Sequence, residues 1–303
     1  FPTRRSSDLI GIFKVALFTS FIYSMNPWFL WSLGNYSVIL SVVLFLFTLF
    51  HRKELYLINE KRLLSFFILV ILHIYLLLIK SDVTILTIIF SILNICVFGF
   101  IIFSRDACRI VSLQFIAKLL ACISLVSIFG LILFFLGFNF SPNVVDYNEG
   151  QYEYYNYYFF LVDLKTIVAD KWRFSGYFLE PAHIGVASTV LLISQNYNFR
   201  KWYNLILLLT VIISFSLAAY VLFIFGLYVK LLLSSKHFVL YTFILLFISM
   251  IVVLIALNYE QGDNFFNKYI FERLSFEDGE MVGNNRVSHG FKQDFERFMD
   301  SNK

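Results

Sequence analysis

The residues best suited to chemistry lie in segment 173–185, where a polar stretch gives way to an apolar one. Pro181 is typical of the first turn of a helix, because its missing N–H is no loss there, so we expect a helix to begin near Glu180. Free N–H groups at that end, with Arg173 close by, would form an anion site suited to a pyrophosphate. Glu180 could then accept a proton from an attacking hydroxyl, and His183 is a candidate to bind substrate. In the plainer interpretation, Glu180 only caps the helix or pairs with Arg173, and His183 is a packed interfacial ring.

A second group of candidate residues lies near the C-terminal end. Arg286 precedes a stretch, 287–299, in which the phenylalanines recur at helical spacing, so we expect a short amphipathic helix lying on the membrane bundle. Arg286 and Arg273 would add phosphate-binding charge if they face the first anion site, and His289 is a second candidate base. The plainer alternative is a solvated charged loop.

Tyrosines are concentrated in the segment that precedes the first of these groups. Six of them lie within twelve residues: Tyr147, Tyr152, Tyr154, Tyr155, Tyr157 and Tyr158. Aromatic faces can stack on sugar rings, and tyrosines also anchor at membrane interfaces. Both roles stay open from the sequence.

The composition of the chain predicts which kind of secondary structure positions these residues. Hydrophobic residues make up 59% of the 303 residues and charged ones only 15%, so one soluble core cannot bury the apolar surface and lipid must solvate most of it. In lipid each segment must satisfy its own backbone polar groups, which selects helices. Cys96, Cys108 and Cys122 have neither a disulfide framework nor metal-ligand spacing, so we expect no metal site and no cofactor.

Apolar stretches long enough to approach a hydrocarbon core of about 30 Å predict an all-α polytopic membrane protein with about nine transmembrane helices. The predicted spans are 10–25, 31–50, 63–79, 83–103, 111–137, 178–194, 202–215, 217–233 and 238–257. A tight turn at 214–216 is needed to keep the spans alternating in direction. If that stretch is one tilted helix, every later loop changes side.

The distribution of Lys and Arg predicts which loops face the cytoplasm. With the turn at 214–216, the basic loops 51–62, 104–110, 195–201 and 230–237 all fall on one side. The long loops 138–177 and 258–303 then both face outward, the second carrying the short amphipathic helix. We expect Lys14 and Lys118, which lie within spans, to reach back to the cytoplasmic end.

The two ends of the sequence are predicted to be cut. Residues 1–9 resemble one reading frame of a DNA-sequencing adapter, and the rival interpretation is the basic region of a signal peptide. The predicted organisation is therefore an adapter-derived stretch at 1–9, a transmembrane bundle at 10–257 and a truncated outer loop at 258–303.

Segment 173–185 resembles the O-antigen polymerase and O-antigen ligase superfamily of bacterial envelope polysaccharide enzymes. The resemblance rests on the pattern R-x-x-G-x-x-x-E-P-x-x-x-G, which includes Gly176 and Gly185, entering a membrane helix after an outer loop. It rests also on the elements that follow: two short spans around a Ser-containing turn, one more span, and a large Arg-bearing outer loop. It covers roughly residues 110–303. The usual Ser-Arg at the turn is replaced by Ser216-Leu217, which weakens a ligase assignment more than a polymerase assignment.

The resemblance implies a metal-independent glycosyltransferase on the outer face of the bacterial inner membrane. It would take a glycan from a polyprenyl pyrophosphate carrier and add it to another carrier-linked repeat unit, building O-antigen, capsular or exopolysaccharide. Arg173, Arg286 and, third, Arg273 would neutralise the leaving pyrophosphate, and Glu180 or His289 would deprotonate the acceptor. In the ligase branch a histidine in the large loop is expected to be the base.

Three alternatives stay open: a ligase acting on a terminal acceptor, a flippase or other transporter of lipid-linked glycan, and a non-catalytic membrane scaffold. A flippase predicts a continuous polar cavity through the bundle. The expected partners are the polyprenyl-pyrophosphate-linked glycan, membrane lipid, and proteins of polysaccharide export and chain-length control, with no nucleic acid.

Overall fold

The computed structural model describes residues 4–51, 53–79, 83–138, 140–147, 152–163 and 173–234. It also describes short pieces at 242–243, 247, 250–251, 254, 258, 276–277 and 280–281. The chain is mostly helical, as predicted. Its helices are α1 (Arg4–Met25), α2 (Ser37–His51), α3 (Glu60–Ile79), α4 (Ile85–Phe103), α5 (Asp106–Phe135), α7 (Pro181–Ser194), α8 (Trp202–Ile213) and α9 (Leu217–Ser234), with 3-10 turns η1 (Trp28–Tyr36) and η2 (Lys53–Leu55).

Three of these helices, α3, α4 and α5, are long and apolar enough to cross a membrane. The apolar parts of the other helices are shorter, and 12-residue α8 is only about 18 Å long at 1.5 Å per residue. Isolated helical residues between Thr242 and Asn258 lie where the ninth span is predicted. The predicted helices are therefore present through 234, whereas the number of spans stays a prediction.

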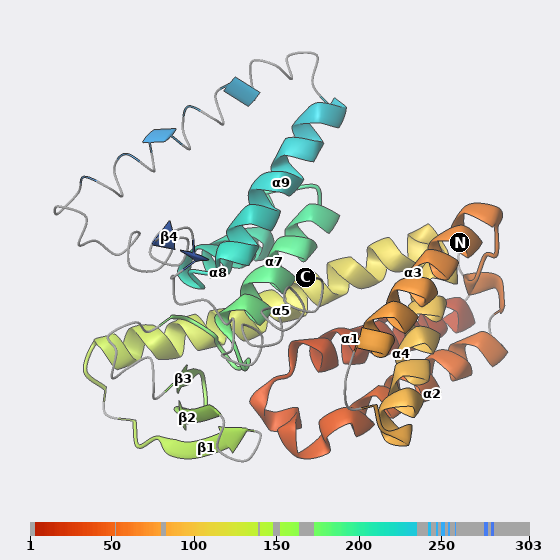
Figure 1. Ribbon diagram of the computed structural model, residues 1–303, viewed down its shortest axis with the longest axis horizontal. Coiled ribbons are helices and arrows are strands. Elements are labelled where there is room, and N and C mark those ends of the chain that lie inside the picture. Colours follow the sequence, from red (N-terminus) through yellow and green to blue (C-terminus); the bar gives the residue numbers. More distant parts are fainter. Residues whose placement is uncertain are drawn as a thin grey trace, which may run out of the picture.

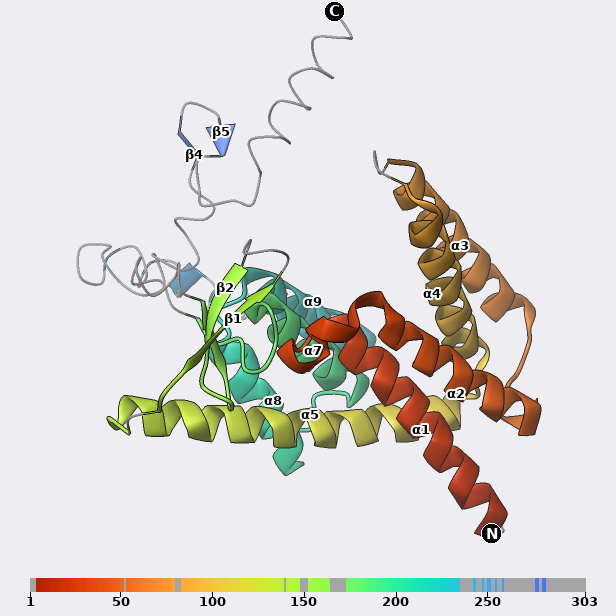
Figure 2. The ribbon, with the colours of Figure 1, turned by 90° about the horizontal axis from the view of Figure 1, so that it is seen from below.

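The surface of α3 explains why this chain needs lipid. None of its residues is buried, and Leu78 is 77% exposed. The helix packs mainly against α4, and Figure 2 shows the two helices leaning away from the rest of the bundle. A continuous apolar surface of this size is stable only against a membrane or another protein.

Helix α5 is the axis of the remaining bundle (Figure 1). Helices α1, α7 and α8 pack against it, α9 packs on α7, and α2 bridges α1 and α4. The buried face of α5 carries small residues at Ser112, Ala117, Ala121, Ser124 and Gly130. Small side chains let helix backbones approach closely, which is the main source of helix association where lipid is as apolar as the side chains.

The predicted turn at 214–216 is confirmed. Helix α8 ends at Ile213, Phe215 has a left-handed φ of 44°, and α9 begins at Leu217. The Ser216 hydroxyl accepts a hydrogen bond from the Ala219 N–H at 3.4 Å, which caps the new helix. The chain therefore reverses here instead of continuing as one tilted helix.

The prediction of an all-α fold is wrong in the first long loop. Strands β1 (Asn143–Tyr147), β2 (Tyr152–Asn156) and β3 (Leu161–Asp163) form an antiparallel sheet in the order β1-β2-β3. Val145 faces Tyr154 across the first pair, and Tyr155 faces Val162 across the second. Valine and tyrosine favour strands, so the signal was present in the tyrosine-rich sequence. A second pair joins β4 (Phe276–Glu277) to β5 (Glu280–Met281).

Two pairs of loops lie together as alternating spans predict. At one end, Pro27 pairs with Phe178 in a β-bridge, which joins the 26–30 connection to the first long loop. At the other, Tyr56 pairs with Ser104, which joins loops 51–62 and 104–110. Lys118 lies over the ring of Tyr203, near the start of α8, at 5.9 Å from its centroid. Which end faces the cytoplasm stays a prediction.

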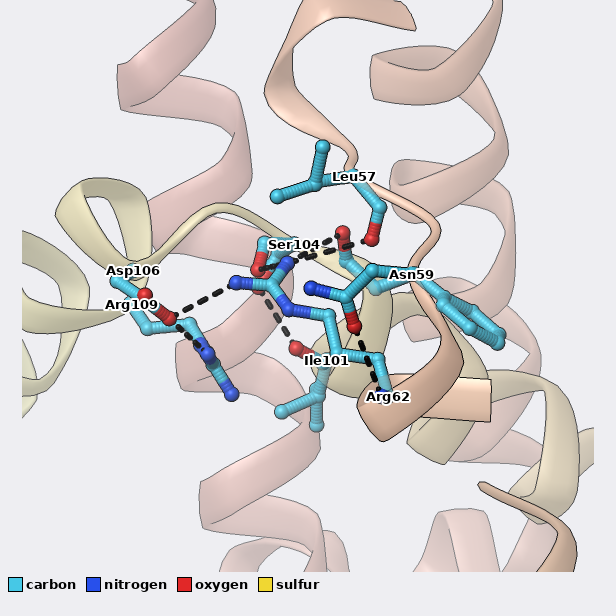
Figure 3. Close-up of polar contacts among 8 residues, drawn as sticks. Leu57, Asn59, Arg62, Ile101, Ser104, Asp106 and Arg109 are labelled. Atoms are coloured by element: carbon cyan, nitrogen blue, oxygen red, sulfur yellow. Dashed lines mark hydrogen bonds and ion pairs between the residues drawn. The ribbon is translucent and has the colours of Figure 1, made fainter. Parts of the chain in front are cut away.

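Arg62 holds the loops 51–62 and 104–110 together (Figure 3). Its guanidinium donates to the carbonyls of Ser104 at 2.7 Å and Phe103 at 3.2 Å, and to the Asp106 carboxylate at 2.9 Å. Asp106 also pairs with Arg109. The arginine therefore satisfies carbonyls at the C-terminal end of α4 while it pairs with the first turn of α5, positions where helix dipoles favour these charges.

The contact between α7 and the α8–α9 turn gives a direct test of this packing. A methyl group at Gly185 would lie 2.6 Å from Ser214 Oγ and 2.9 Å from Ala219 Cβ. Gly185→Ala should therefore destabilise the protein by about 1–3 kcal/mol through overpacking, lowering the thermal unfolding midpoint in detergent. Gly11→Ala is the matched control, because nothing lies within 4 Å of a methyl group there. Equal midpoints for the two variants would contradict the close approach.

Candidate functional site

Segment 173–185 begins α7 in the predicted way. Glu180 is the N-cap, with extended backbone at φ −140° and ψ 149°, and Pro181 is the first helical residue. The Glu180 side chain makes no capping hydrogen bond. Capping by this side chain is therefore not its role, whereas pairing with Arg173 stays open as the plainer interpretation.

The supply of free N–H groups at this helix end is smaller than predicted. Pro181 has no N–H, and the N–H of His183 donates to the Glu180 carbonyl at 3.0 Å. Backbone donors at the start of α7 therefore contribute less to an anion site than expected, and a larger share falls on side chains such as Arg173.

The backbone leading to Glu180 is held by hydrogen bonds from two distant parts of the chain. The Trp28 N–H, at the start of η1, donates to the Tyr177 carbonyl at 3.0 Å. The Leu161 N–H, in β3, donates to the Gly176 carbonyl at 2.8 Å. The α1–α2 connection and the sheet therefore both hold the backbone of segment 173–180 in place by hydrogen bonds.

Tyr154 contacts the residue that precedes Glu180. Its hydroxyl donates to the Leu179 carbonyl at 2.7 Å, and both residues are buried. Trp31 of η1 packs on the Tyr154 ring, 5.7 Å between centroids. The sequence does not indicate which tyrosine of the cluster reaches this carbonyl, and it gives no signal for Trp31.

Gly176 permits the turn by which segment 173–180 passes from β3 to the start of α7. Its φ is +58°, and a methyl group there would lie 3.1 Å from Ile184 Cδ1. Phe174 and Phe178 on either side are each only 1% exposed. Glycine suits this position because it adopts positive φ without steric cost and leaves room for the first turn of α7.

Glu180 is 9% exposed, whereas Arg173 and His183 are half-buried. A carboxylate that is so little exposed, at the end of an apolar helix, must have polar or charged partners, because an isolated buried charge is costly. These three polar residues of one short segment are therefore at least partly buried at the start of α7.

The second predicted group lies outside the described residues. Arg273, Arg286, His289 and the amphipathic helix at 287–299 belong to it. Their predicted approach to Arg173 and Glu180 stays a prediction. Within the part of the chain that the structure describes, no three His, Cys, Asp or Glu side chains gather as metal ligands.

The tyrosine cluster divides between structural and exposed roles. Tyr154 and Tyr157 are buried, and Tyr157 stacks on Phe160 with 5.0 Å between ring centroids. Burial raises the pKa of the Tyr157 hydroxyl above its ordinary value. Tyr158 is exposed, with its hydroxyl accepting from Asn143 Nδ2 at 2.7 Å, so its ring is accessible to a ligand or to the membrane interface.

An apolar cavity of about 380 Å³ lies between α1, η1 and α2. It is lined by Phe18, Thr19, Ile22, Phe29, Leu30, Leu33, Tyr36 and Leu40. Its lining residue Phe29 follows Trp28, whose N–H binds the Tyr177 carbonyl. The cavity therefore adjoins the element that holds the Glu180 segment.

Comparisons with known protein families, characterised proteins and solved structures find no match for this chain. The resemblance to the polymerase and ligase superfamily therefore remains a prediction from segment 173–185 and the order of the elements after it.

Removing the Tyr154 hydroxyl tests how the site is held. Tyr154→Phe should leave the Leu179 carbonyl buried without its donor and cost about 1–3 kcal/mol, seen as a lower unfolding midpoint and faster proteolysis of the first long loop. Tyr75→Phe, an exposed tyrosine in α3, is the control and should change neither. Unchanged proteolysis of Tyr154→Phe would show that the sheet does not fix this segment.

Proposed function

We propose that this protein is a membrane glycosyltransferase that polymerises polyprenyl-pyrophosphate-linked oligosaccharide repeat units at the outer face of the bacterial inner membrane. The observation that carries the proposal is the position of Glu180. Glu180 is only 9% exposed at the start of α7, and it follows a segment whose backbone is held by η1 and β3. A general base needs a fixed position of this kind.

The proposed step is a displacement at the anomeric carbon of the carrier-linked glycan. The acceptor hydroxyl oxygen forms a bond to that carbon, its proton passes to Glu180, and the bond from the carbon to the polyprenyl pyrophosphate oxygen breaks. The departing pyrophosphate takes the electron pair, and Arg173 stabilises its growing negative charge. Arg286 and Arg273 are proposed to assist, with His289 as the alternative base.

The surroundings of the segment suit an isoprenoid carrier. The 380 Å³ cavity is lined almost entirely by apolar side chains and lies beside η1, which binds the Tyr177 carbonyl through Trp28. A polyprenyl chain in or near this cavity would leave its pyrophosphate at the polar end, toward Arg173. Exposed Tyr158 offers an aromatic face that a sugar ring could stack on.

The test is glycan chain extension by the variants Glu180→Gln, Arg173→Ala and Arg286→Ala in a strain that lacks its own polymerase. Removing a general base should slow extension by about 10²–10⁴-fold, so long polymer should disappear while the protein stays in the membrane. Lys61→Ala is the control, since Lys61 is an exposed charge at the opposite end of the bundle.

Wild-type polymer length in both Glu180→Gln and Arg173→Ala would overturn the proposal. Loss of transfer to a terminal acceptor with normal polymer length would instead assign the ligase reaction.

A further inference from the structure

A second cavity lies at the opposite end of α7 from Glu180. It is a shallow hollow of about 570 Å³ that is wide open at the surface, and it is lined by the turn 195–200 together with Lys230 of α9. Nothing in the proposed transfer reaction uses it, because the length of α7 separates the two ends.

The turn that forms this cavity is firmly built. Asn196 and Tyr197 both have left-handed φ, 53° and 51°, which non-glycine residues adopt only when their surroundings impose it. Lys230 Nζ donates to the Asn196 carbonyl at 2.8 Å, and the Tyr197 hydroxyl donates to the Phe223 carbonyl at 3.0 Å. Burial raises the pKa of Tyr197 to about 12, so this donor keeps its proton.

Positive charge is concentrated around the cavity. Arg200 and Lys230 line it directly. Lys201 Nζ donates to the side-chain oxygen of the lining residue Gln195 at 3.4 Å. Lys201 and Lys118 both lie against the ring of Tyr203, at 5.7 and 5.9 Å from its centroid.

The neighbouring elements supply little negative charge. Residues 181–259 contain no Asp or Glu, so α7, α8 and α9 carry none. The only acidic residue of α5 is Asp106, which pairs with Arg62 and Arg109. Cations brought together without acidic neighbours repel one another, and an anion bound among them relieves that repulsion.

Apolar side chains are exposed on the two helices next to the cavity. Trp202, at the start of α8, is 51% exposed, and Leu205 of α8 and Val221 and Phe225 of α9 are also exposed. A tryptophan at a helix end beside apolar side chains is typical of the membrane interface. A ligand here would therefore have its charged group in the cavity and apolar chains along the helices.

We infer that this cavity binds the phosphate headgroup of an anionic phospholipid. Arg200 and Lys230 contact the phosphate, Lys201 and Lys118 add to the positive potential, and the acyl chains lie on α8 and α9. The inference does not depend on the glycosyltransferase proposal, because it uses the other end of α7.

The test uses the full chain purified in detergent and exposed to phosphatidylglycerol or phosphatidylcholine, with retained lipid measured by native mass spectrometry. Wild-type protein should retain phosphatidylglycerol preferentially. Arg200→Gln should weaken retention about fivefold, and Arg200→Gln with Lys230→Gln about 30-fold, as expected for each basic residue near an anionic surface. Lys61→Gln removes the same charge from an exposed position away from the cavity and should bind as wild type.

Arg200→Gln is the decisive variant, because its side chain takes no part in the hydrogen bonds that build the turn, whereas Lys230 does. Retention of phosphatidylglycerol by Arg200→Gln at the wild-type level, or equal retention of phosphatidylcholine by wild type, would overturn the inference. Displacement of the lipid by millimolar inorganic phosphate would also overturn it, by assigning the cavity to a free phosphate compound.

Discussion

The hydrogen bonds that hold the backbone before Glu180 are the constraint on which the rest of the structure depends. Trp28 binds the Tyr177 carbonyl, Leu161 binds the Gly176 carbonyl, and Tyr154 binds the Leu179 carbonyl. Irregular backbone at the boundary of an apolar medium is stable only when its polar groups are satisfied. The α1–α2 connection and the small sheet meet this requirement from two sides, and so determine where α7 begins and where Glu180 lies.

Small residues let the helices of the bundle pack closely around the start of α7. The serines and alanines of α5 let α7 and α8 pack closely on it, and Gly185 admits the Ser214 hydroxyl at the α8–α9 turn. This turn reverses the chain, so that α9 returns to the loop after α7, where Lys230 donates to the Asn196 carbonyl. Polar groups therefore lie at both ends of α7: Glu180 at its N-terminal end, and the basic cavity that contains Arg200 at its C-terminal end.

The helices, the start of α7 at Pro181 and the turn at 214–216 could all be predicted, because apolar length, proline and short polar breaks are local signals. The sheet could not be separated from an interfacial loop in the sequence, because valines and tyrosines are typical of both. The roles of Trp28 and Tyr154 could not be predicted, since each depends on a contact with a distant segment. The missing N–H of Pro181 is visible in the sequence, whereas the use of the His183 N–H by the Glu180 carbonyl is shown only by the folded backbone.

The most direct test of the central claim is photo-crosslinking with a polyprenyl diphosphate that carries a photoreactive group close to its diphosphate. The claim is that the segment ending at Glu180 binds a polyprenyl pyrophosphate. Mass spectrometry should then find adducts on peptides within 173–185, and unlabelled polyprenyl diphosphate should suppress them. Adducts confined to other peptides, or adducts in this segment that unlabelled diphosphate does not suppress, would contradict it.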